Sequence, residues 1–297
     1  GKKRVSKSGL QGTALFRELS DAYEENALMR QAAAMVFLFV LVTNTYNFYA
    51  HSHFMAPRIS NPSIMSLGRS KTGQTVIIDD FREAYWWLRD NTPDDARVLS
   101  WWDYGYQING IANRTTIADG NTWNHEHIAL LGKSLVSPTG AAHQIVRHLA
   151  DYVLVWSTRF GGHGGDDIAK SPHMARIGGS VYKEINPEEF YMDQKQKPSD
   201  MMAKSLIYNA VSYRLDPNAM GFEEGTFEEA YTTTHRMVRI YKVLDVDEDS
   251  KAYGKEGHGY QAWLAGRPLE SAYPPALQKV LAGKQDFAQL EDFNRNA

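Results

Sequence analysis

The stretch that organises this chain reads Ala96-Arg97-Val98-Leu99-Ser100-Trp101-Trp102-Asp103-Tyr104-Gly105-Tyr106. Its apolar first part predicts a short strand, and the polar groups follow where that strand ends. An indole offers one N–H donor and a large apolar face, whereas an ionised aspartate offers only acceptors. Trp101, Trp102 and Asp103 can therefore grip a small hydroxyl group, and a glycine lets the backbone turn sharply beside it. The alternative is structural, because a tryptophan after a strand is usually a core residue.

Composition bounds the class of protein. A chain of 297 residues holds one large domain or two modest ones, and an apolar content of 43% is ordinary for a folded protein. The net charge of −3 and the pI of 6.4 do not indicate nucleic-acid binding. Cysteine is absent, which excludes disulfides, thiolate metal ligands and a cysteine nucleophile.

The N-terminal part predicts a membrane anchor. Residues 1–30 are first basic and then mixed, and no Lys, Arg, Asp or Glu occurs from Gln31 to Pro57. The strongly apolar core from Ala32 to Val42 is shorter than the ~20 residues that cross a bilayer, but aromatic residues extend it. We expect a last transmembrane helix at 31–50, with residues 1–30 cytosolic and the remainder on the opposite face. The alternative is a helix buried in a soluble domain.

The rest of the chain predicts a mixed α/β layered domain at 75–246. Residues 51–74 are rich in Pro, Ser and Gly and predict a linker or irregular lid. Asp80 and Glu83 have the spacing of a capping box at the start of an amphipathic helix. Residues 247–297 form a tail with one short helix, and no internal repeat is present.

Helices and strands alternate within this domain. Helices are expected at 124–135, 140–150, from Ser171 and at 199–215, and strands at 97–102, 114–118, 151–156 and 237–244. The run 151–156 is continuously apolar, as in a buried parallel strand. If it pairs in parallel with the strand before Trp101, the segments that follow both strands emerge at the edge where open α/β sheets bind ligands.

A second constellation follows the strand 151–156. It reads Asp167-x-x-Lys170-x-x-x-Met174-x-x-Ile177. Met174 and Ile177 are one helical step apart and share a face, and a carboxylate is favoured at the start of a helix. The structural alternative is a capped helix with an ordinary ion pair and two core residues.

Together the two constellations are specific. Trp-Trp-Asp-Tyr-Gly, followed by Asp-x-x-Lys-x-x-x-Met, resembles the catalytic subunit of oligosaccharyltransferase in its eukaryotic form. The resemblance covers residues 60–245 and extends to the flanking segments 79–85, 121–124, 171–177, 229–231 and 238–243.

The resemblance implies roles for individual residues. Five residues would bind the acceptor peptide: Trp101, Trp102 and Asp103 at the Ser/Thr hydroxyl, and Met174 and Ile177 at the threonine methyl. Four residues would support the two motifs: Tyr104, Gly105, Asp167 and Lys170. Tyr106 would lie near the lipid pyrophosphate of the donor.

The resemblance also implies a reaction and a location. Such an enzyme transfers an oligosaccharide from a dolichol-linked donor to the asparagine of Asn-x-Ser/Thr, in the endoplasmic reticulum membrane, with this domain in the lumen. Other oligosaccharyltransferase subunits are expected partners. The catalytic groups and the ligands of Mn²⁺ or Mg²⁺ would lie in a membrane portion before Gly1, so we expect this chain alone to be inactive. The alternative is a noncatalytic module that binds peptide or glycan.

Two other motifs are weaker evidence for a binding site. His125-Glu126-His127 resembles a metal pair, but alternate residues diverge on a helix and no third ligand is evident. The glycines at 161–165 lack the Gly-Lys-Ser/Thr of a phosphate-binding loop.

Overall fold

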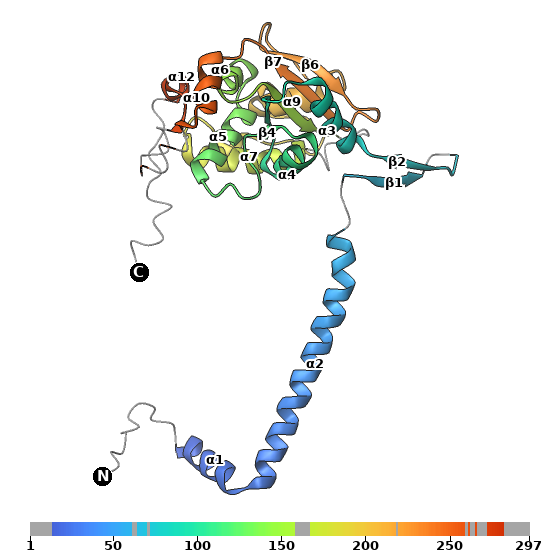
Figure 1. The fold of residues 1–297 in the computed structure, drawn as a ribbon, viewed down its shortest axis with the longest axis vertical. Helices are drawn as coiled ribbons and strands as arrows, with labels where there is room; N and C mark the ends of the chain where they lie inside the picture. The colour runs from blue at the N-terminus through green and yellow to red at the C-terminus, as the bar shows by residue number, and fades with distance from the viewer. Residues whose placement is uncertain are drawn as a thin grey trace. The chain divides into compact units, whose positions relative to one another are not determined.

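The computed structural model describes the chain except residues 1–13, 61–63, 70–71, 158–166, 218, 259–260, 262–264, 266–271 and 282–297. The predicted glycine loop at 161–165 lies outside the described residues. The chain divides into two units, residues 1–63 and 64–297. Figure 1 shows the elements of both.

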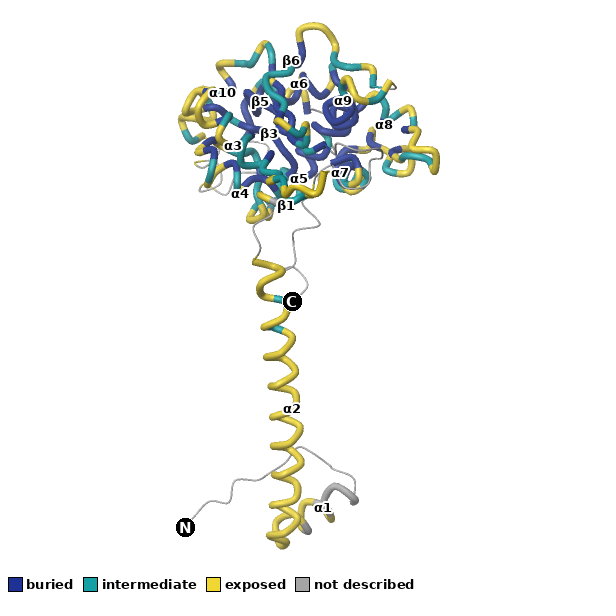
Figure 2. Tube along the Cα trace, turned by 90° about the vertical axis from the view of Figure 1, so that its right-hand side faces the viewer, coloured by how far each residue is buried: buried dark blue, intermediate teal, exposed yellow. Residues whose placement is uncertain are grey.

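The N-terminal unit consists of two helices, α1 (Ala14–Glu25) and α2 (Ala27–Ile59). Asn26 separates them, and its side chain caps α2 by accepting hydrogen bonds from the backbone N–H groups of Leu28 and Met29. At a rise of 1.5 Å per residue, α2 extends roughly 50 Å. None of its described residues is buried (Figure 2).

Helix α2 is long and apolar enough to cross a membrane. It extends beyond the predicted span of 31–50 at both ends. That it is inserted in a bilayer, and which face the following domain occupies, stay predictions.

The prediction of an irregular linker at 51–74 is wrong at both ends. Helix α2 continues to Ile59 although it contains Pro57. Residues further on form an antiparallel hairpin of β1 (Ser66–Arg69) and β2 (Thr75–Ile78). The β-branched run of β2 favours a strand, and Gly73 supplies a positive φ of 81° in the turn.

The C-terminal unit is built on a five-stranded sheet in the order β4-β3-β5-β7-β6. Its strands are β3 (Arg97–Leu99), β4 (Thr115–Thr116), β5 (Tyr152–Trp156), β6 (Phe227–Thr232) and β7 (Val238–Val243). The first three are parallel, and β7 and β6 continue the sheet antiparallel. β5 is central and buried along most of its length, as its apolar run predicts.

Helices pack around this sheet, and the mixed α/β prediction is confirmed. The longer ones are α3 (Asp80–Asn91), α5 (His125–Val136), α6 (Thr139–Leu149) and α7 (Asp167–Val181). Shorter helices are α8 (Asp200–Lys204), α9 (Leu206–Ser212), α10 (Glu248–Lys255) and α12 (Pro275–Val280). The predicted helices at 124–135 and 140–150 correspond to α5 and α6.

Three local predictions are corrected. α7 begins at Asp167 and not at Ser171, so Pro172 lies within its first turns. The helix expected at 199–215 is divided, because the Ser205 hydroxyl caps α9 by accepting from the Tyr208 backbone N–H. Asp80 and Glu83 form no capping box. The N-cap residue is Asp79, which makes no side-chain cap bond. The side chains of Asp80 and Glu83 instead accept hydrogen bonds from another segment.

The tail at 247–297 includes folded elements that join the domain. Asp247 caps α10 by accepting from the Ser250 backbone N–H. The Ser250 hydroxyl lies 2.9 Å from His148 Nδ1 of α6, and Lys251 Nζ donates to Asp151. These contacts attach α10 to the amino-terminal end of β5.

The parallel pairing of β3 and β5 brings the two constellations to one edge of the sheet. Leu99 pairs with Val153, so Trp101 follows β3 at the same edge where Trp156 ends β5. Trp156 in turn pairs with Val238 at the start of β7. The β6–β7 turn therefore emerges at this edge too, which the sequence did not indicate.

We expect Gly105→Ala to destabilise the fold. Gly105 has ordinary helical angles (φ −58°, ψ −44°), so a sharp turn does not require it. An added Cβ would lie 2.3 Å from the Ala118 carbonyl oxygen. Overpacking of this kind costs roughly 1–3 kcal/mol, measurable by denaturant unfolding of the purified chain.

Gly110→Ala is the matched control, because no atom lies within 4 Å of its added Cβ. Equal stabilities of the two variants would show that the contact between Gly105 and Ala118 is not tight.

Candidate functional site

The segment after β3 is a series of tight helical turns. Trp101 has an extended conformation, residues Trp102–Tyr104 form a 3-10 turn, and Gly105–Gln107 form α4. A π-helical turn, Ile108–Ala112, follows and ends at Asn113, whose φ is 50°. These compact turns place Asp103 and Tyr104 beside the first turn of α7.

Asp167 begins α7 and is almost completely buried. One carboxylate oxygen accepts a hydrogen bond of 2.8 Å from the backbone N–H of Trp156. The other accepts one of 2.6 Å from the Tyr104 hydroxyl. Asp167 thus joins the end of β5 to the segment that follows β3.

Lys170 lies one helical turn further on and completes the cluster. Its Nζ donates to Asp103 Oδ2 at 2.6 Å and to the Tyr104 hydroxyl oxygen at 2.7 Å. It also lies 3.4 Å from Asp167 Oδ1. The aromatic rings of Tyr104 and Trp156 lie 4.5 and 5.3 Å from the ammonium. We call Asp103, Tyr104, Asp167 and Lys170 the lysine cluster.

Burial dominates the electrostatics of this cluster. It raises the pKa of Asp167 to about 6, while Lys170 and the N–H and O–H donors oppose the shift and Asp103 adds to it. Burial and the two neighbouring carboxylates raise the pKa of the Tyr104 hydroxyl above its ordinary value. Tyr104 therefore acts as a neutral hydrogen-bond relay between Lys170 and Asp167.

The indoles of Trp101 and Trp102 lie close together, directly before the cluster residues Asp103 and Tyr104 in the chain. Trp101 is buried and Trp102 is half-buried, with ring centroids 6.3 Å apart. Within the described residues, neither indole N–H has an acceptor. Asp103 Oδ1 is also without a partner and is covered. These donors and this acceptor suit a hydroxyl group, which can reach Asp103 Oδ1 only when the atoms that cover it move.

Met174 and Ile177 lie further along α7. Met174 is completely buried, and Ile177 is half-buried against the core. The backbone of Met174 packs closely on Gly132 of α5, where an added Cβ would lie 2.6 Å from the Met174 carbonyl oxygen. A direct contact between Met174 and a bound ligand therefore requires the covering atoms to move.

Tyr106 is the most exposed of the predicted site residues, with 53% of its surface accessible. Its ring lies against Gly120, where an added Cβ would be 2.9 Å from Tyr106 Cε2. The side chain belongs to the same segment as Trp102 but takes no part in the lysine cluster.

The described residues contain no group of three or more His, Cys, Asp or Glu side chains that could hold a metal ion. Those residues therefore do not fit a divalent metal. His127 contacts the Tyr273 hydroxyl and the Ile117 carbonyl, each at 2.8 Å. His125 lies 2.8 Å from the Ser180 hydroxyl. The two histidines thus serve separate contacts.

Phe81 and Trp156 also border the site, although neither belongs to the two sequence motifs. The Phe81 ring centroid lies 5.7 Å from that of Tyr104 and 5.6 Å from that of Trp156. The Trp156 indole nitrogen is buried without a hydrogen-bond partner. The position of Trp156 at the end of a buried strand was the available signal for it. Phe81 lies on a separate helix, and its contacts were not visible in the sequence.

Comparison with known proteins identifies a family. A family model described as the STT3/PglB/AglB core domain matches residues 94–160. The Caenorhabditis elegans dolichyl-diphosphooligosaccharide–protein glycosyltransferase subunit stt-3 is 37% identical over 273 residues, covering 79% of this chain and 36% of that protein. The Saccharomyces cerevisiae subunit STT3 is 37% identical over 232 residues, covering 69% and 32%.

The chain thus spans about a third of the length of these curated relatives. Among solved structures, the C-terminal globular domain of oligosaccharyltransferase from Archaeoglobus fulgidus matches with a TM-score of 0.40 and 21% identity. That match covers 56% of this chain and 97% of the archaeal one.

The raised pKa of Asp167 predicts a pH-dependent stability. Because its pKa in the folded chain is about 6, against an ordinary 3.8, the folded state binds this proton more tightly than the unfolded chain does. The resulting stabilisation is present below about pH 4 and is lost as the pH rises to 6. Relative to Asp167→Asn, the wild type should therefore lose roughly 1–3 kcal/mol of unfolding free energy across this range.

Denaturant unfolding at several pH values measures this difference, with Asp249→Asn, at an exposed position of α10, as the control. A difference between wild type and Asp167→Asn that does not change with pH would contradict the shifted titration.

Proposed function

We propose that this chain, which belongs to the STT3/PglB/AglB family of oligosaccharyltransferase subunits, is the acceptor-recognising C-terminal part of a glycosyltransferase. The full-length enzyme transfers a lipid-linked oligosaccharide to the asparagine of Asn-x-Ser/Thr. Its acceptor is a nascent polypeptide and its donor is dolichol-linked. The convergence of the two motifs on Lys170 is the observation that supports this proposal most.

Hydroxyl recognition follows from the chemistry of the groups at the sheet edge. The indole N–H groups of Trp101 and Trp102 donate to the oxygen of the acceptor hydroxyl, and that hydroxyl donates a hydrogen bond to Asp103. Lys170 holds the other carboxylate oxygen of Asp103 and thereby sets the direction of the unpaired one. An alanine at this place in the acceptor leaves these buried groups unpaired, so a site built in this way rejects it strongly.

Threonine is preferred to serine through its methyl group. One buried methyl group contributes about 0.8 kcal/mol, which predicts a preference of a few fold rather than exclusion of serine. Met174 and Ile177 are the apolar side chains that we assign to this contact.

The bond-forming chemistry belongs to parts of the enzyme outside this chain. We assign the catalytic groups and the ligands of Mn²⁺ or Mg²⁺ to that remainder, and Tyr106 to the neighbourhood of the donor pyrophosphate. Helix α2 is assigned to the endoplasmic reticulum membrane and the C-terminal unit to the lumen. Other oligosaccharyltransferase subunits are the proposed protein partners. The reading of this chain as a noncatalytic module has no specific observation in its favour.

Trp102→Phe in the full-length enzyme should lower kcat/KM for an Asn-x-Thr peptide by about 10- to 100-fold. The change keeps an aromatic ring but removes the indole N–H donor together with part of the ring, which leaves the acceptor hydroxyl with one hydrogen bond fewer. Transfer to a fluorescent peptide by purified enzyme measures the effect.

Trp86→Phe, at an exposed position on α3, is the matched control and should change kcat/KM less than twofold. Wild-type kinetics of Trp102→Phe would remove Trp102 from the acceptor site.

Met174→Ala should narrow the preference for threonine over serine to near unity. Removing a buried methionine also destabilises the protein by roughly 2–5 kcal/mol, but lost active enzyme affects both peptides equally. The ratio of kcat/KM values for Asn-x-Thr and Asn-x-Ser peptides is therefore the readout.

Met202→Ala, at a buried position on α8, should leave that ratio unchanged. An unaltered ratio in Met174→Ala would exclude Met174 from the threonine contact.

A further inference from the structure

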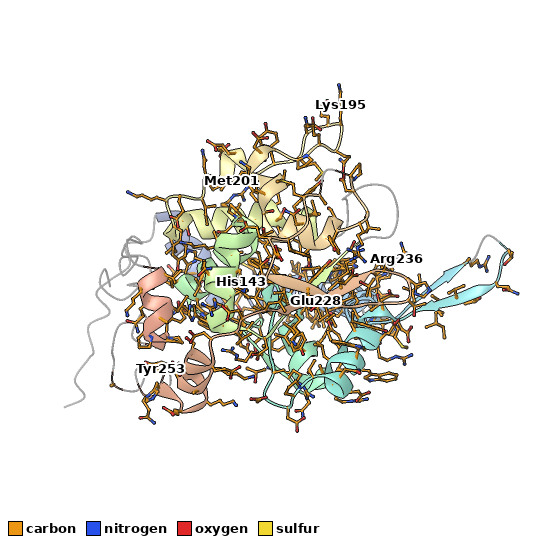
Figure 3. All side chains as sticks on the ribbon, turned by 90° about the horizontal axis from the view of Figure 1, so that it is seen from above. His143, Lys195, Met201, Glu228, Arg236 and Tyr253 are labelled. Atoms are coloured by element: carbon orange, nitrogen blue, oxygen red, sulfur yellow. The ribbon has the colours of Figure 1, made fainter. Side chains whose placement is uncertain are left out.

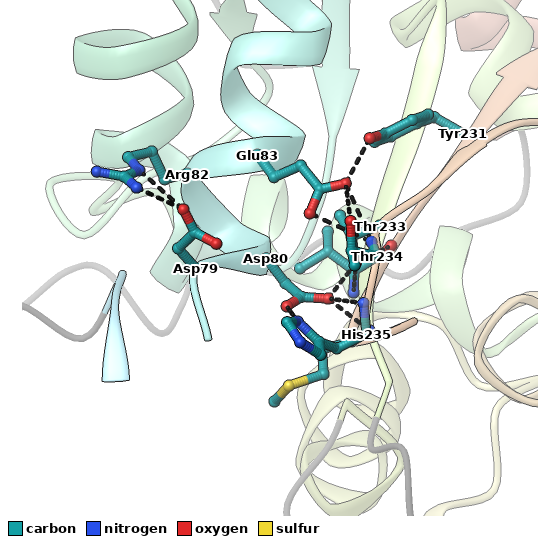
Figure 4. Close-up of polar contacts among 10 residues, drawn as sticks. Asp79, Asp80, Arg82, Glu83, Tyr231, Thr233, Thr234 and His235 are labelled. Carbon is teal, nitrogen blue, oxygen red and sulfur yellow. Dashed lines mark hydrogen bonds and ion pairs between the residues drawn. The ribbon is translucent and has the colours of Figure 1, made fainter. Parts of the chain in front are cut away.

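Two acidic side chains at the start of α3 bind the turn that joins β6 and β7 (Figure 4). The Asp80 carboxylate, almost completely buried, accepts hydrogen bonds from the Thr233 hydroxyl at 2.5 Å and the backbone N–H groups of His235 and Met237 at 3.1 and 3.2 Å. Its second oxygen lies 2.7 Å from His235 Nδ1. Asp80 thus satisfies four polar groups of a single turn.

Glu83, one helical turn later, binds the same region. Its carboxylate accepts from the Tyr231 hydroxyl at 2.5 Å and from the Thr234 backbone N–H at 3.0 Å. The Tyr231 ring stacks on Trp87 of α3, with centroids 5.0 Å apart and planes 8° from parallel. We call Asp80, Glu83 and residues 231–237 the α3 clasp.

The charge of Asp80 suits this arrangement. Burial alone would raise the pKa of its carboxyl group, but the hydrogen bonds from Thr233, His235 and Met237 outweigh burial and hold the pKa below its ordinary value. Asp80 is consequently ionised at neutral pH, and its hydrogen bonds are charge-assisted, which makes them stronger than neutral ones.

Phe81 connects the clasp to the lysine cluster. It follows Asp80 directly, and its ring packs against both Tyr104 and Trp156. These are the two rings beside the Lys170 ammonium. Phe81 thus supports the two rings that hold Lys170 in place. A shift of the first turn of α3 would withdraw this support.

We propose that Asp80 is a positioning residue for acceptor binding, which it supports through Phe81. The clasp holds the first turn of α3 against the β6–β7 turn, Phe81 then holds Tyr104 and Trp156, and these keep Lys170 directed at Asp103. This inference rests on the proposed function, because it assigns the lysine cluster to the acceptor site. Since the transfer chemistry lies elsewhere, loosening the clasp should weaken acceptor binding and leave turnover at saturation intact.

Asp80→Asn in the full-length enzyme tests the inference. The amide keeps the shape but loses the charge and presents a donor toward the turn's own donors. We expect the acceptor-peptide KM to rise about tenfold, with kcat and the donor KM each changed less than twofold.

Asp151→Asn is the matched control. Asp151 is also buried and ionically bound, accepting from the Arg97 backbone N–H at 2.7 Å and from Lys251 at 3.2 Å. It precedes β5, whereas the clasp lies beyond the other end of that strand. Arg236 of the clasp turn and Tyr253 of α10 accordingly lie on opposite sides of the domain (Figure 3). Asp151→Asn should lower the melting temperature yet leave the acceptor KM within twofold of wild type.

Phe81→Leu provides the second variant and should raise the acceptor KM to a similar extent with the clasp intact. The double variant Asp80→Asn/Phe81→Leu should have an acceptor KM no higher than that of the single variant with the higher KM, because both changes act through one contact. If Asp80→Asn does not fold, the acceptor KM of Phe81→Leu alone tests the inference.

Three outcomes separate the claims. A raised acceptor KM in both single variants, with Asp151→Asn unaffected, supports the inference. An unchanged acceptor KM in either single variant, or an equal rise in Asp151→Asn, overturns it while Trp102→Phe remains impaired. Wild-type kinetics of Trp102→Phe would instead overturn the proposed assignment of Trp102 to the acceptor site.

Discussion

The lysine cluster depends on the neutralisation of buried charge. Asp167 has almost no contact with solvent, and an isolated carboxylate in that position would be costly. Lys170, the Tyr104 hydroxyl and the Trp156 backbone N–H offset this cost together. Because removing one partner of a buried ion pair leaves an uncompensated charge, the four groups act as a unit. The two sequence motifs are therefore parts of one structure.

The cluster in turn constrains the surrounding fold. Asp167 follows β5 and Asp103 follows β3, so the parallel pairing of these strands is what brings them together. The absence of a side chain at Gly105 lets the segment after β3 pack against Ala118. A third element, α3, reaches the same edge through Phe81. The proposed acceptor site thus depends on the sheet topology as much as on the residues that would meet the ligand.

Much of this architecture could be predicted because its signals are local. The continuous apolar run of β5 marks that strand, and Asn124 caps α5 locally by accepting from the His127 backbone N–H. β6 was missed, since Glu228 and Glu229 obscure its pattern and a register shift interrupts its pairing with β7. Asp80 and Glu83 match a capping box by spacing, yet tertiary hydrogen bonds to the β6–β7 turn take their side chains.

The site could be predicted in its composition but not in its packing. The motifs identified Asp103 and Lys170, but the burial of Met174 and the role of Tyr104 as a relay depend on contacts between distant segments. Pro172 favoured a helix start at Ser171, whereas the described helix already includes Asp167, whose carboxylate is held by Trp156 and Tyr104. Long-range contacts of this kind leave no periodic pattern in the sequence.

The most direct measurement is an experimental structure of the full-length enzyme with a bound Asn-x-Thr peptide. The account predicts that the threonine hydroxyl lies within about 3.2 Å of the indole nitrogens of Trp101 and Trp102 and of the free carboxylate oxygen of Asp103. Lys170 would remain bound to the other oxygen. A peptide seated elsewhere, or a threonine hydroxyl that contacts none of these three groups, would contradict it.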